Sequence, residues 1–532
     1  MIRISQIKIS IDDPIEKVKD IALKVLRLEE ADIKDFRIYK QSIDARRRGK
    51  LELVHTVDLT VDNEEAILSR NIPNITKTPQ VDYIMPTEGT TPMKHRPVVI
   101  GFGPAGMYAA LLLAQKGYRP IVLERGEAVE ERVKAIDKFW SVGELSPNSN
   151  VQFGEGGAGT FSDGKLTTRV KDLRGRKVLE ELVAAGAPED ILYMAHPHVG
   201  TDLLRGIVKN MREEIIRLGG EVRFNCQVKD FIIEDGKLVG LQIPGGTLET
   251  NHAVLAIGHS ARDTFFKLYD RNVDMTAKPF AVGIRIEHPQ FVINDAQYKE
   301  FSGHPKLGAA EYRLTHKASN GRGVYTFCMC PGGLVVPSSS EKGRLVTNGM
   351  SEHARDEANA NAGLLVTVGP ADFGSDHPLA GVEYQRKLEE KAFGLGGSNY
   401  VAPAQLVGDF LKGQKSKAIG SVKPSYALGV KMINLNKLFP DEILEPMREA
   451  LKAFDRKLKG FAMDDAIMTA VESRSSSPVR IERSSETFQS PTASGLYPSG
   501  EGAGFAGGIV SAGIDGLKCA QTIIEEFAPP TE

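Results

Sequence analysis

Apolar positions recur with strand and then helix spacing at the start of the chain. "IRISQIKISI" alternates apolar and polar residues, which is typical of a strand, and "DPIEKVKDIALKVLRL" places apolar residues at helical spacing. "FRIYKQSIDA" and "KLELVHTVDLTV" predict two further strands around the turn "RRRGK". Residues 76–96 carry three prolines and no periodicity, which is typical of a linker.

A strand–glycine–helix–strand pattern follows the linker. The strand "PVVI" leads into Gly101, Gly103 and Gly106, which open an apolar helix that ends at Gly117. A second strand, "PIVLE", closes with Glu124, 18 residues after Gly106. This context predicts a dinucleotide site, because the glycines let backbone N–H groups approach a pyrophosphate while the acidic residue accepts ribose hydroxyls.

Two further G-x-G-x-x-G runs lack that context. Residues 154–159 are followed by no helix-forming stretch. Residues 502–507 follow the strand "GLYPSGE" and open a helix, but the chain stops at Glu532 without a second strand. "AVLAIGHSARD" also runs a strand into a glycine, Gly258. We therefore predict one nucleotide-binding unit whose ligand is also contacted by these other loops.

The wide separation of these loops favours FAD over NAD. A nicotinamide dehydrogenase keeps its nucleotide fold contiguous, whereas here the phosphate-style loops lie at both ends of a long segment. We expect the pyrophosphate at Gly101–Gly106 and the flavin at the final strand-to-helix turn. The positive end of the helix beginning near Gly507–Ile509 would stabilise the anionic reduced flavin.

Several stretches together resemble a bacterial family of FAD-dependent dehydrogenases, or NAD(P)/FAD-dependent oxidoreductases. Its members carry a small N-terminal domain ahead of a glutathione-reductase-type FAD fold. The resemblance implies bound FAD and a separate substrate domain inserted in the FAD fold, but no particular substrate. Gly500-Glu501 departs from the commoner Gly-Asp of related flavoproteins, and the longer acid can make the same hydrogen bonds. The matching stretches are "VVIGFGPAGMYAAL", "FGEGGAGTFSDGKLTTR", "HPHVGTDLL", "FCMCPGGLVVPSSSE", "VTNGMS", "SRSSSPVRI" and "GLYPSGEGAGFAGGIVSAGIDG".

The predicted fold class is α/β, with a discontinuous Rossmann-like FAD-binding domain of three layers, β-sheet and helices. An α+β substrate domain is inserted in it, and a small ferredoxin-like α/β domain precedes it. The predicted boundaries are 1–75 for the N-terminal domain, 76–96 for the linker, 97–262 and 488–532 for the FAD-binding domain, and 263–487 for the substrate or cap domain.

The predicted FAD-binding residues come from every glycine-rich loop and the strand ends beside them. Glu501 is expected to hold ribityl or ribose hydroxyls, and Lys165 to lie near the isoalloxazine. The full set is Gly101, Gly103, Pro104, Ala105, Gly106, Glu124, Arg125, Gly156, Gly157, Thr160, Ser162, Asp163, Lys165, Val228, Gly258, Gly500, Glu501, Gly507, Gly508 and Ile509.

Cys330 is the first candidate for the chemistry. Cys328 and Cys330 lie on a β-like run, so their side chains are expected on one face. A redox or nucleophilic thiol beside a flavin is one interpretation, and two small buried apolar residues are the other. C-x-C without further ligands is a poor metal pair, and no metal site is predicted.

His198 and Arg474 are the other catalytic candidates. His196 and His198 precede a predicted helix, where either could donate a proton or serve only the local structure. Arg474 and Arg480 lie among serines, and each could anchor a substrate carboxylate or phosphate, or pair at a surface or between domains.

Composition narrows the setting and the partners. The chain of 532 residues is 41% hydrophobic and 26% charged with a net charge of −2, so no global charge favours nucleic acid or an anionic membrane. Four cysteines without C-x-x-C favour a reducing cytoplasm, and Met107–Ala114, the longest apolar run, is too short to span a membrane. The basic tip Arg46–Arg48 is a solvated hairpin or, as the alternative, a nucleic-acid contact.

The function predicted from the sequence is an FAD-dependent oxidoreductase that transfers hydride between the flavin and a small organic substrate. NAD(P)H could visit the flavin as a transient electron donor. The alternatives are a flavin-dependent RNA-modifying enzyme that docks through its N-terminal domain, and a flavin-bound sensor without turnover. The sequence leaves the substrate, the electron acceptor and the oligomeric state open.

Overall fold

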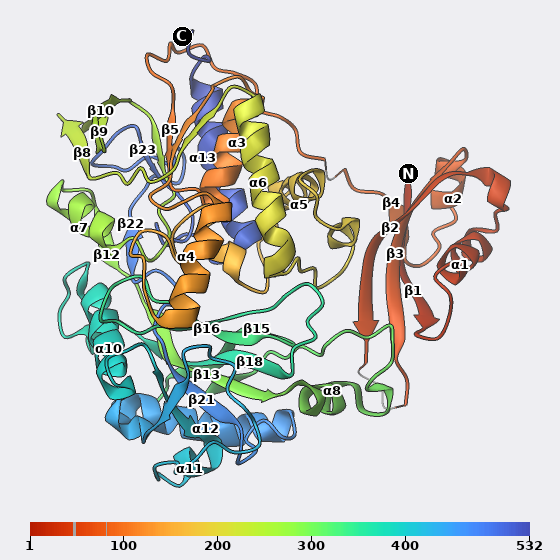
Figure 1. Ribbon diagram of the computed structural model, residues 1–532. Helices are drawn as coiled ribbons and strands as arrows, with labels where there is room; N and C mark the ends of the chain where they lie inside the picture. The colour runs from red at the N-terminus through yellow and green to blue at the C-terminus, as the bar shows by residue number, and fades with distance from the viewer. Residues whose placement is uncertain (46–48, 81, 532) are drawn as a thin grey trace.

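Three main sheets organise the protein, whose computed structural model describes residues 1–45, 49–80 and 82–531 (Figure 1). A four-stranded sheet lies at the N-terminus, a five-stranded parallel sheet holds the glycine-rich loops, and a seven-stranded mixed sheet lies below it. The basic tip Arg46–Arg48 lies outside the described residues. The chain is therefore a mixed α/β structure with parallel and antiparallel sheets.

The N-terminal sheet is antiparallel and packs on two helices. Its strand order is β2-β3-β1-β4, and both helices follow inner strands of that sheet. The predicted helix and the three predicted strands are confirmed, while the short last strand was missed. The elements are β1 (Ile2–Ser10), α1 (Lys17–Leu26), β2 (Ile33–Asp44), β3 (Glu52–Val61), α2 (Glu64–Leu68) and β4 (Ile75–Lys77).

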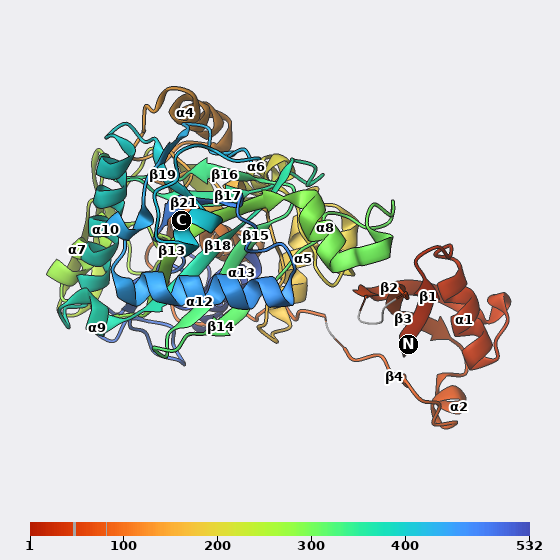
Figure 2. The same ribbon diagram turned by 90° about the horizontal axis from the view of Figure 1, so that it is seen from below.

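Hydrogen bonds join the N-terminal unit to the rest of the described chain, although Figure 2 shows it set apart. In its edge strand, the Gln41 N–H donates to the Tyr193 carbonyl and the Gln41 carbonyl accepts from the Ala195 N–H, each at 2.8 Å. His304 Nε2 lies 3.2 Å from a carboxylate oxygen of Asp12. The N-terminal unit is thus hydrogen-bonded to two separate loops of the main body.

The five-stranded sheet is parallel throughout and has the order β23-β11-β5-β6-β7. Helices α3, α5, α6 and α13 share a hydrophobic core on one face of it. The strands predicted around Gly101–Gly106, at 253–255 and near the chain end are confirmed. The helices predicted after Gly106 and after the last strand are confirmed as well. The elements are β5 (Val98–Ile100), α3 (Pro104–Gln115), β6 (Ile121–Leu123), α5 (Arg174–Ala184), α6 (Thr201–Arg217), β7 (Glu221–Arg223), β11 (Ala253–Leu255), β23 (Leu496–Pro498) and α13 (Ile509–Glu526).

Helices α3 and α13 cross in near backbone contact. A Cβ added to Gly516 would lie 2.0 Å from the carbonyl oxygen of Ala105, so only glycine fits the crossing. Tyr118, just after α3, is fully buried and donates to the Ile524 carbonyl at 3.1 Å. The last helix of the chain is therefore locked onto the first helix of the nucleotide unit.

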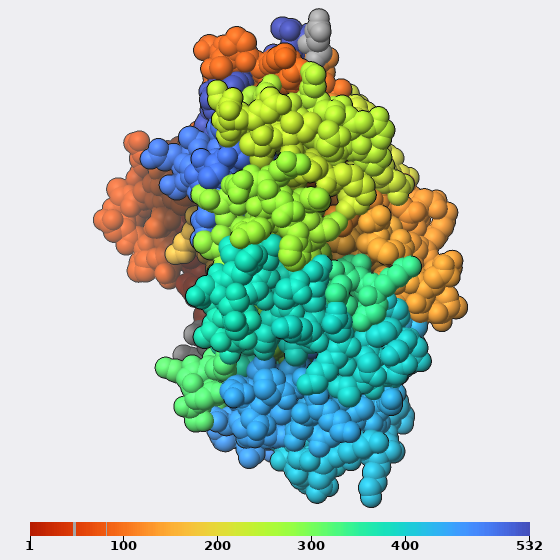
Figure 3. Space-filling model, turned by 90° about the vertical axis from the view of Figure 1, so that its left-hand side faces the viewer, coloured from red at the N-terminus to blue at the C-terminus, as the bar shows by residue number. Residues whose placement is uncertain are grey.

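The seven-stranded sheet is ordered β14-β15-β18-β13-β21-β19-β20 and lies in the lower half of Figure 1. In Figure 3 the lower half of the visible face is mostly cyan and light blue, the colours of residues beyond about 350. The long helix α12 packs its apolar side on one face of it. The strands are β13 (Phe280–Pro289), β14 (Thr315–Lys317), β15 (Gly323–Cys330), β18 (Asn359–Val368), β19 (Ala402–Leu406), β20 (Val430–Met432) and β21 (Ile467–Glu472). The helices are α8 (Gln290–Tyr298), α9 (Pro370–Phe373), α10 (Ala380–Gly396), α11 (Val407–Leu411) and α12 (Asp441–Lys457).

Smaller elements join these sheets. They are α4 (Val129–Val142), α7 (Arg262–Asp270), the sheet of β8 (Asp230–Glu234), β9 (Lys237–Ile243) and β10 (Gly246–Glu249), and the pairs β12 (Met275–Ala277) with β22 (Val479–Ile481) and β16 (Leu334–Pro337) with β17 (Thr347–Met350). Among the described residues, every helix falls short of the length and apolar character that a bilayer crossing requires.

We predict that Gly516→Ala destabilises the fold by about 1–3 kcal/mol, the usual effect of overpacking a dense core. The added methyl would meet the Ala105 carbonyl and force α13 away from α3. Gly206→Ala is the matched control, because Gly206 lies in α6 with no atom within 4 Å of an added Cβ. Chemical denaturation should show a lower midpoint for Gly516→Ala and an unchanged or higher one for Gly206→Ala. Equal midpoints for Gly516→Ala and the parent would contradict the tight crossing.

Candidate functional site

The first glycine-rich loop lies between β5 and α3 and holds its backbone close to neighbouring strands. Gly101 has a φ of 96°, and a Cβ there would lie 2.4 Å from the carbonyl oxygen of Ala256. Gly103 caps α3, and Pro104 occupies the first helical turn, where its missing N–H costs nothing. The unpaired N–H groups of that turn give the helix start a partial positive charge, which suits a phosphate group.

Glu124, at the end of β6, ties two loops together. Its carboxylate accepts from the Phe102 N–H at 2.9 Å, the Gly126 N–H at 2.9 Å and the Gly154 N–H at 3.0 Å. A carboxylate offers about four acceptor positions, so about one is left for a ligand hydroxyl. The side chain is buried, and its orientation is fixed by these three backbone donors.

The other two glycine-rich loops meet the first at the start of α3. A Cβ added to Gly157 would lie 2.9 Å from the Cα of Gly103. A Cβ added to Gly500 would lie 2.7 Å from the Cβ of Ala105. The structure therefore brings the three loops predicted from the sequence to one place, although they are far apart along the chain.

The space at this meeting point is open and polar. Cβ atoms added to Gly258 or Gly507 would meet no atom within 4 Å, and Gly508 caps the N-terminus of α13. The buried Nε2 of His259 has no hydrogen-bond partner among the described residues, and Nδ1 of the same ring lies 3.6 Å from Glu501. Two helix N-termini, an unpartnered imidazole nitrogen and room beside glycines fit an elongated ligand with a diphosphate and hydroxyl groups.

The loop at 160–165 connects this region to the large sheet. Lys165 donates from Nζ to the Met329 carbonyl at 2.5 Å, at the end of β15. Asp163 accepts from the Arg355 guanidinium, at 2.9 Å from Nε and 2.5 Å from Nη2. Lys165 and Asp163, which were predicted to lie near the flavin, are thus hydrogen-bonded to residues of the part of the chain that forms the seven-stranded sheet.

Arg474 belongs to a buried ion network between the two sheets. Its guanidinium donates to Glu389 from Nε and Nη2, each at 3.0 Å, and from Nη1 to the hydroxyls of Ser340 at 2.6 Å and Ser260 at 3.0 Å. Glu389 also binds Arg262, at 2.6 and 2.8 Å, and these two arginines lower its pKa despite burial. Of the two interpretations of Arg474, these surroundings favour pairing between domains.

The two cysteines of β15 do not share a face, so that prediction was wrong. The strand register shifts between Phe327 and Cys330, and Cys328 has a φ of 40°. Such a bulge breaks the alternation of side chains that a regular strand would give. Cys328 is exposed, whereas the Cys330 thiol is buried and donates to the Cys328 carbonyl at 3.3 Å. Burial raises the pKa of Cys330 to about 11, so this thiol stays protonated at neutral pH.

His198 lies in the segment that pairs with the Lys165 loop. Its Nε2 lies 3.0 Å from the His353 carbonyl oxygen, and its ring stacks on that of His353 with centroids 5.2 Å apart. Burial is the main cause that lowers the pKa of His198 below its usual value. The imidazole is therefore neutral at physiological pH, with one ring nitrogen engaged by the protein backbone.

The remaining predicted residues line the edges of the same region. Arg125 forms an ion pair with Asp263 at 2.9 Å, and its guanidinium carbon lies 4.3 Å from the centroid of the Phe153 ring. Ser162 donates to the Gly159 carbonyl at 2.6 Å. Thr160 and Val228 are buried.

Sequence reasoning missed the residues that hold the loops in place. Arg132 is fully buried and donates to the carbonyls of Asn150, Val151 and Glu155 at 2.6–3.0 Å. An arginine inside an amphipathic helix gives no sign of such a role. His259 offered a better signal, since it follows Gly258 in the strand-to-glycine run.

Comparison with known proteins adds the family. Residues 279–475 match a model described as an FAD-dependent protein, C-terminal domain-like, and residues 1–60 match a domain of unknown function. An uncharacterised protein of Clostridium beijerinckii is 52% identical over 531 residues, which cover 99% of each chain.

Solved structures give only remote likenesses. Glycine oxidase from Bacillus cereus shares 11% identity with a TM-score of 0.32, covering 82% of this chain and 99% of that one. L-amino acid deaminase from Proteus vulgaris shares 11% identity with a TM-score of 0.32, covering 85% and 98%. The halogenase PltM shares 11% identity with a TM-score of 0.38, covering 80% and 68%. Scores this low carry nothing about substrate.

We predict a pH-dependent stability from Glu155, in the second glycine-rich loop. Burial raises the pKa of this carboxyl to about 7, above the ordinary 4.5 of the unfolded chain, although Arg212 lies 3.0 Å away. The folded state therefore holds a proton that the unfolded state has lost between pH 4.5 and 7, and stability falls by about 2–3 kcal/mol across that window. Glu155→Gln should remove this fall in urea unfolding measured from pH 5 to 8.

Glu214 supplies the control, since it pairs with Arg217 rather than with Arg212 and has a lowered pKa. When the pKa of a carboxyl group is lower in the folded state, its contribution to stability is already complete above the pKa of the unfolded chain. The difference in stability between Glu214→Gln and the parent should therefore stay constant from pH 5 to 8. A constant difference for Glu155→Gln as well would refute the raised pKa.

Proposed function

Because the chain belongs to the family of FAD-dependent proteins defined by that C-terminal domain, we propose that it is an oxidoreductase. It transfers hydride between the flavin of FAD and a small organic substrate. The observation that carries the proposal is the meeting of three glycine-rich loops and two helix N-termini around an open polar space. That space lies beside the large sheet that the family model covers.

The domain organisation is part of the proposal. Residues 97–262 and 488–532 form a discontinuous Rossmann-like FAD-binding domain, supported by a parallel sheet whose edge strand β23 comes from the chain end. Residues 263–487 form the inserted substrate domain, residues 1–75 a ferredoxin-like domain, and residues 76–96 the linker. The βαββαβ order of the first unit supports the ferredoxin-like assignment.

The residues of each loop would hold a different part of FAD. Gly101–Gly106 and the start of α3 would bind the diphosphate, and Glu124 a ribose hydroxyl. The start of α13 at Gly508 and Ile509 would face the flavin carbonyl side, where a helix N-terminus stabilises negative charge. His259 and Glu501 would donate to and accept from the linking hydroxyls. FAD supplies two-electron chemistry, and the chain orients it and limits water at its face.

The roles of the catalytic candidates follow from their surroundings. Lys165 and His198 lie on paired segments between the glycine-rich loop and the large sheet, and they orient the polar side of the reaction space. Arg474 positions the two domains through Glu389. Cys330 packs in the sheet, since its thiol is buried and protonated.

Anaerobic reduction tests the activity. The FAD-loaded protein is titrated with NADH, NADPH and a panel of metabolites while the flavin absorbance is followed. Bleaching by a metabolite alone identifies a dehydrogenase, and bleaching by NADPH alone identifies a reductase or oxygenase. A flavin that stays oxidised with every donor would refute the oxidoreductase assignment and favour a sensor.

We predict that Gly507→Val weakens FAD binding at least about tenfold without destabilising the apoprotein. A Cβ added to Gly507 meets no protein atom within 4 Å, and φ there is not left-handed, so we expect the clash to be with the ligand. Gly394→Val is the control, because Gly394 in α10 is equally open and remote from the loops. FAD affinity is measured by quenching of flavin fluorescence. Unchanged affinity in Gly507→Val would refute the placement of the ligand at α13.

A further inference from the structure

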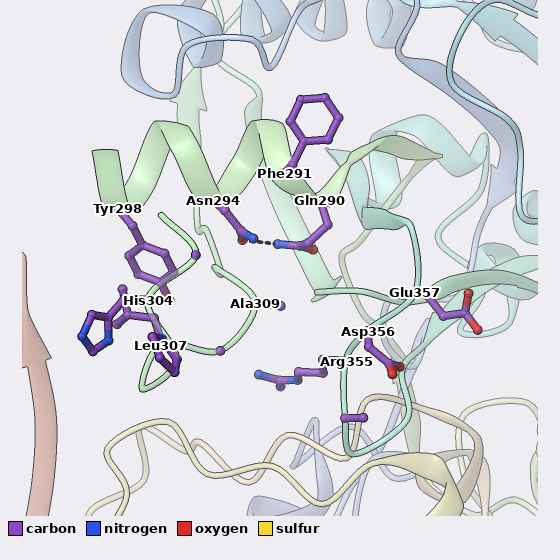
Figure 4. Close-up of a pocket in the computed structure, with 14 residues that line it drawn as sticks. Gln290, Phe291, Asn294, Tyr298, His304, Leu307, Ala309, Arg355, Asp356 and Glu357 are labelled. Carbon is purple, nitrogen blue, oxygen red and sulfur yellow. Dashed lines mark hydrogen bonds between the residues drawn. The ribbon is translucent and has the colours of Figure 1, made fainter. Parts of the chain in front are cut away.

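A cavity of about 440 Å³ lies outside the FAD site, between α8 and two loops at 303–309 and 354–357 (Figure 4). Sites for small molecules typically enclose about 300–1,000 Å³, so the volume suits a compound of modest size. Figure 4 shows Tyr298 and His304 on one side, with Asp356 and Glu357 on the other. Arg355 lies between them along the lower wall.

Arg355 links this cavity to the glycine-rich region. Its side chain is 9% exposed, and its backbone has a left-handed φ of 52°. Bulky residues rarely adopt that conformation, and such strain gathers at functional sites. The guanidinium uses three of its five donors, two on Asp163 and one on Glu311 at 2.6 Å. Two donors remain for a ligand carboxylate.

Glu311 lies behind Arg355, towards Lys165. One of its oxygens binds Arg355, while the other lies 3.6 Å from Lys165 Nζ and 3.9 Å from His196 Nδ1. Both separations exceed hydrogen-bond length, so a ligand or water between them can donate to this oxygen and accept from the Lys165 ammonium. Tyr298, on α8, lines the cavity itself.

The opposite wall carries carboxylates that nothing neutralises. Among the described residues, no hydrogen bond or ion pair reaches the carboxylate of Asp356 or Glu357, and both residues are exposed. Phe291, on α8, is 65% exposed at the rim. Unpaired carboxylates favour an ammonium group.

We propose that this cavity is a ligand site for a small zwitterion, a compound with both a carboxylate and an ammonium group, and that it is separate from the place where a substrate meets the flavin. Its carboxylate takes the free donors of Arg355, and its ammonium faces Asp356 and Glu357. This inference goes beyond the proposed function, because hydride transfer requires a substrate in contact with the flavin and none of the residues assigned to FAD lines this cavity. Asp163 and Lys165 connect the cavity to the proposed flavin site.

The N-terminal domain then has a role in holding the site. Its loop at Asp12 and Asp13 contacts the cavity wall, where Lys306 donates to the Asp13 carbonyl at 2.6 Å and His304 lies 3.2 Å from Asp12. The wall at 303–309 is thereby fixed relative to α8.

Calorimetric titration of the FAD-loaded protein tests the ligand class. The probes are L-phenylalanine and its two matched analogues, 3-phenylpropanoate without the amine and 2-phenylethylamine without the carboxylate, with L-leucine and its corresponding analogues as a second set. We expect each zwitterion to bind at least about tenfold more tightly than its analogues, the loss typical of one charge-assisted hydrogen bond. Absence of zwitterion binding up to about 10 mM, or equal affinities within a set, would overturn the inference.

Two variants place the site. Gly308 lines the cavity, and an added Cβ there meets no atom within 4 Å, so Gly308→Leu should fill the cavity without unfolding the protein. We expect it to weaken zwitterion binding at least about tenfold, while Gly394→Leu leaves binding unchanged. Asp356→Asn should reduce the preference for the zwitterion over the carboxylate analogue. Both variants should keep the melting temperature and the FAD content of the parent.

The outcomes separate this inference from the proposed function. Zwitterion binding that is sensitive to Gly308→Leu would support the ligand site, whether or not any metabolite bleaches the flavin. Flavin bleaching by a metabolite, together with no zwitterion binding or with zwitterion binding that is unaffected by Gly308→Leu, would support the oxidoreductase and overturn the cavity assignment.

Discussion

Close approach of backbones at glycines is the constraint on which the half with the parallel sheet and the glycine-rich loops depends. The crossing of α3 and α13 requires Gly516, because its neighbour is the Ala105 carbonyl itself. That crossing sets the start of α13 beside the start of α3, so two helix N-termini serve one space. The loops at Gly157 and Gly500 then close on the same point. Together with the pairing of β23 to β11 and of β11 to β5, these contacts fix the chain end relative to the loop at Gly101–Gly106.

A second constraint is the buried charge network that joins the two large sheets. Removing Arg262, Glu389 and Arg474 from water is costly, and only complete pairing offsets that cost. Glu389 meets both arginines, and serines from each side take further donors. A network of this kind adds little net stability but tolerates few geometries. It therefore fixes how the seven-stranded sheet faces the glycine-rich loops.

The helices and strands around the glycine-rich loops were predictable because their sequence signals are local. A β-branched strand, spaced glycines and an apolar helix define the fingerprint within about thirty residues, as typical of this unit. The same reasoning found the last strand and helix. It failed at Cys328, since a bulge depends on the partner strand and leaves no mark in an alternating pattern. It also could not find the partner of Arg474, because Glu389 lies 85 residues away in a helix that looks amphipathic.

The contacts of Arg355 explain how the proposed ligand cavity is coupled to the glycine-rich loops. Asp163 belongs to the loop that follows the second glycine run, and Glu311 belongs to the part of the chain that the family model matches. One guanidinium holds both carboxylates, so a ligand that draws on its free donors also acts on the loop at 160–165. Lys165, two residues after Asp163, is held by the Met329 carbonyl at the end of β15. A ligand in the cavity would therefore affect the loop at 160–165 through Arg355 and Asp163, which are hydrogen-bonded to each other, rather than through a domain movement.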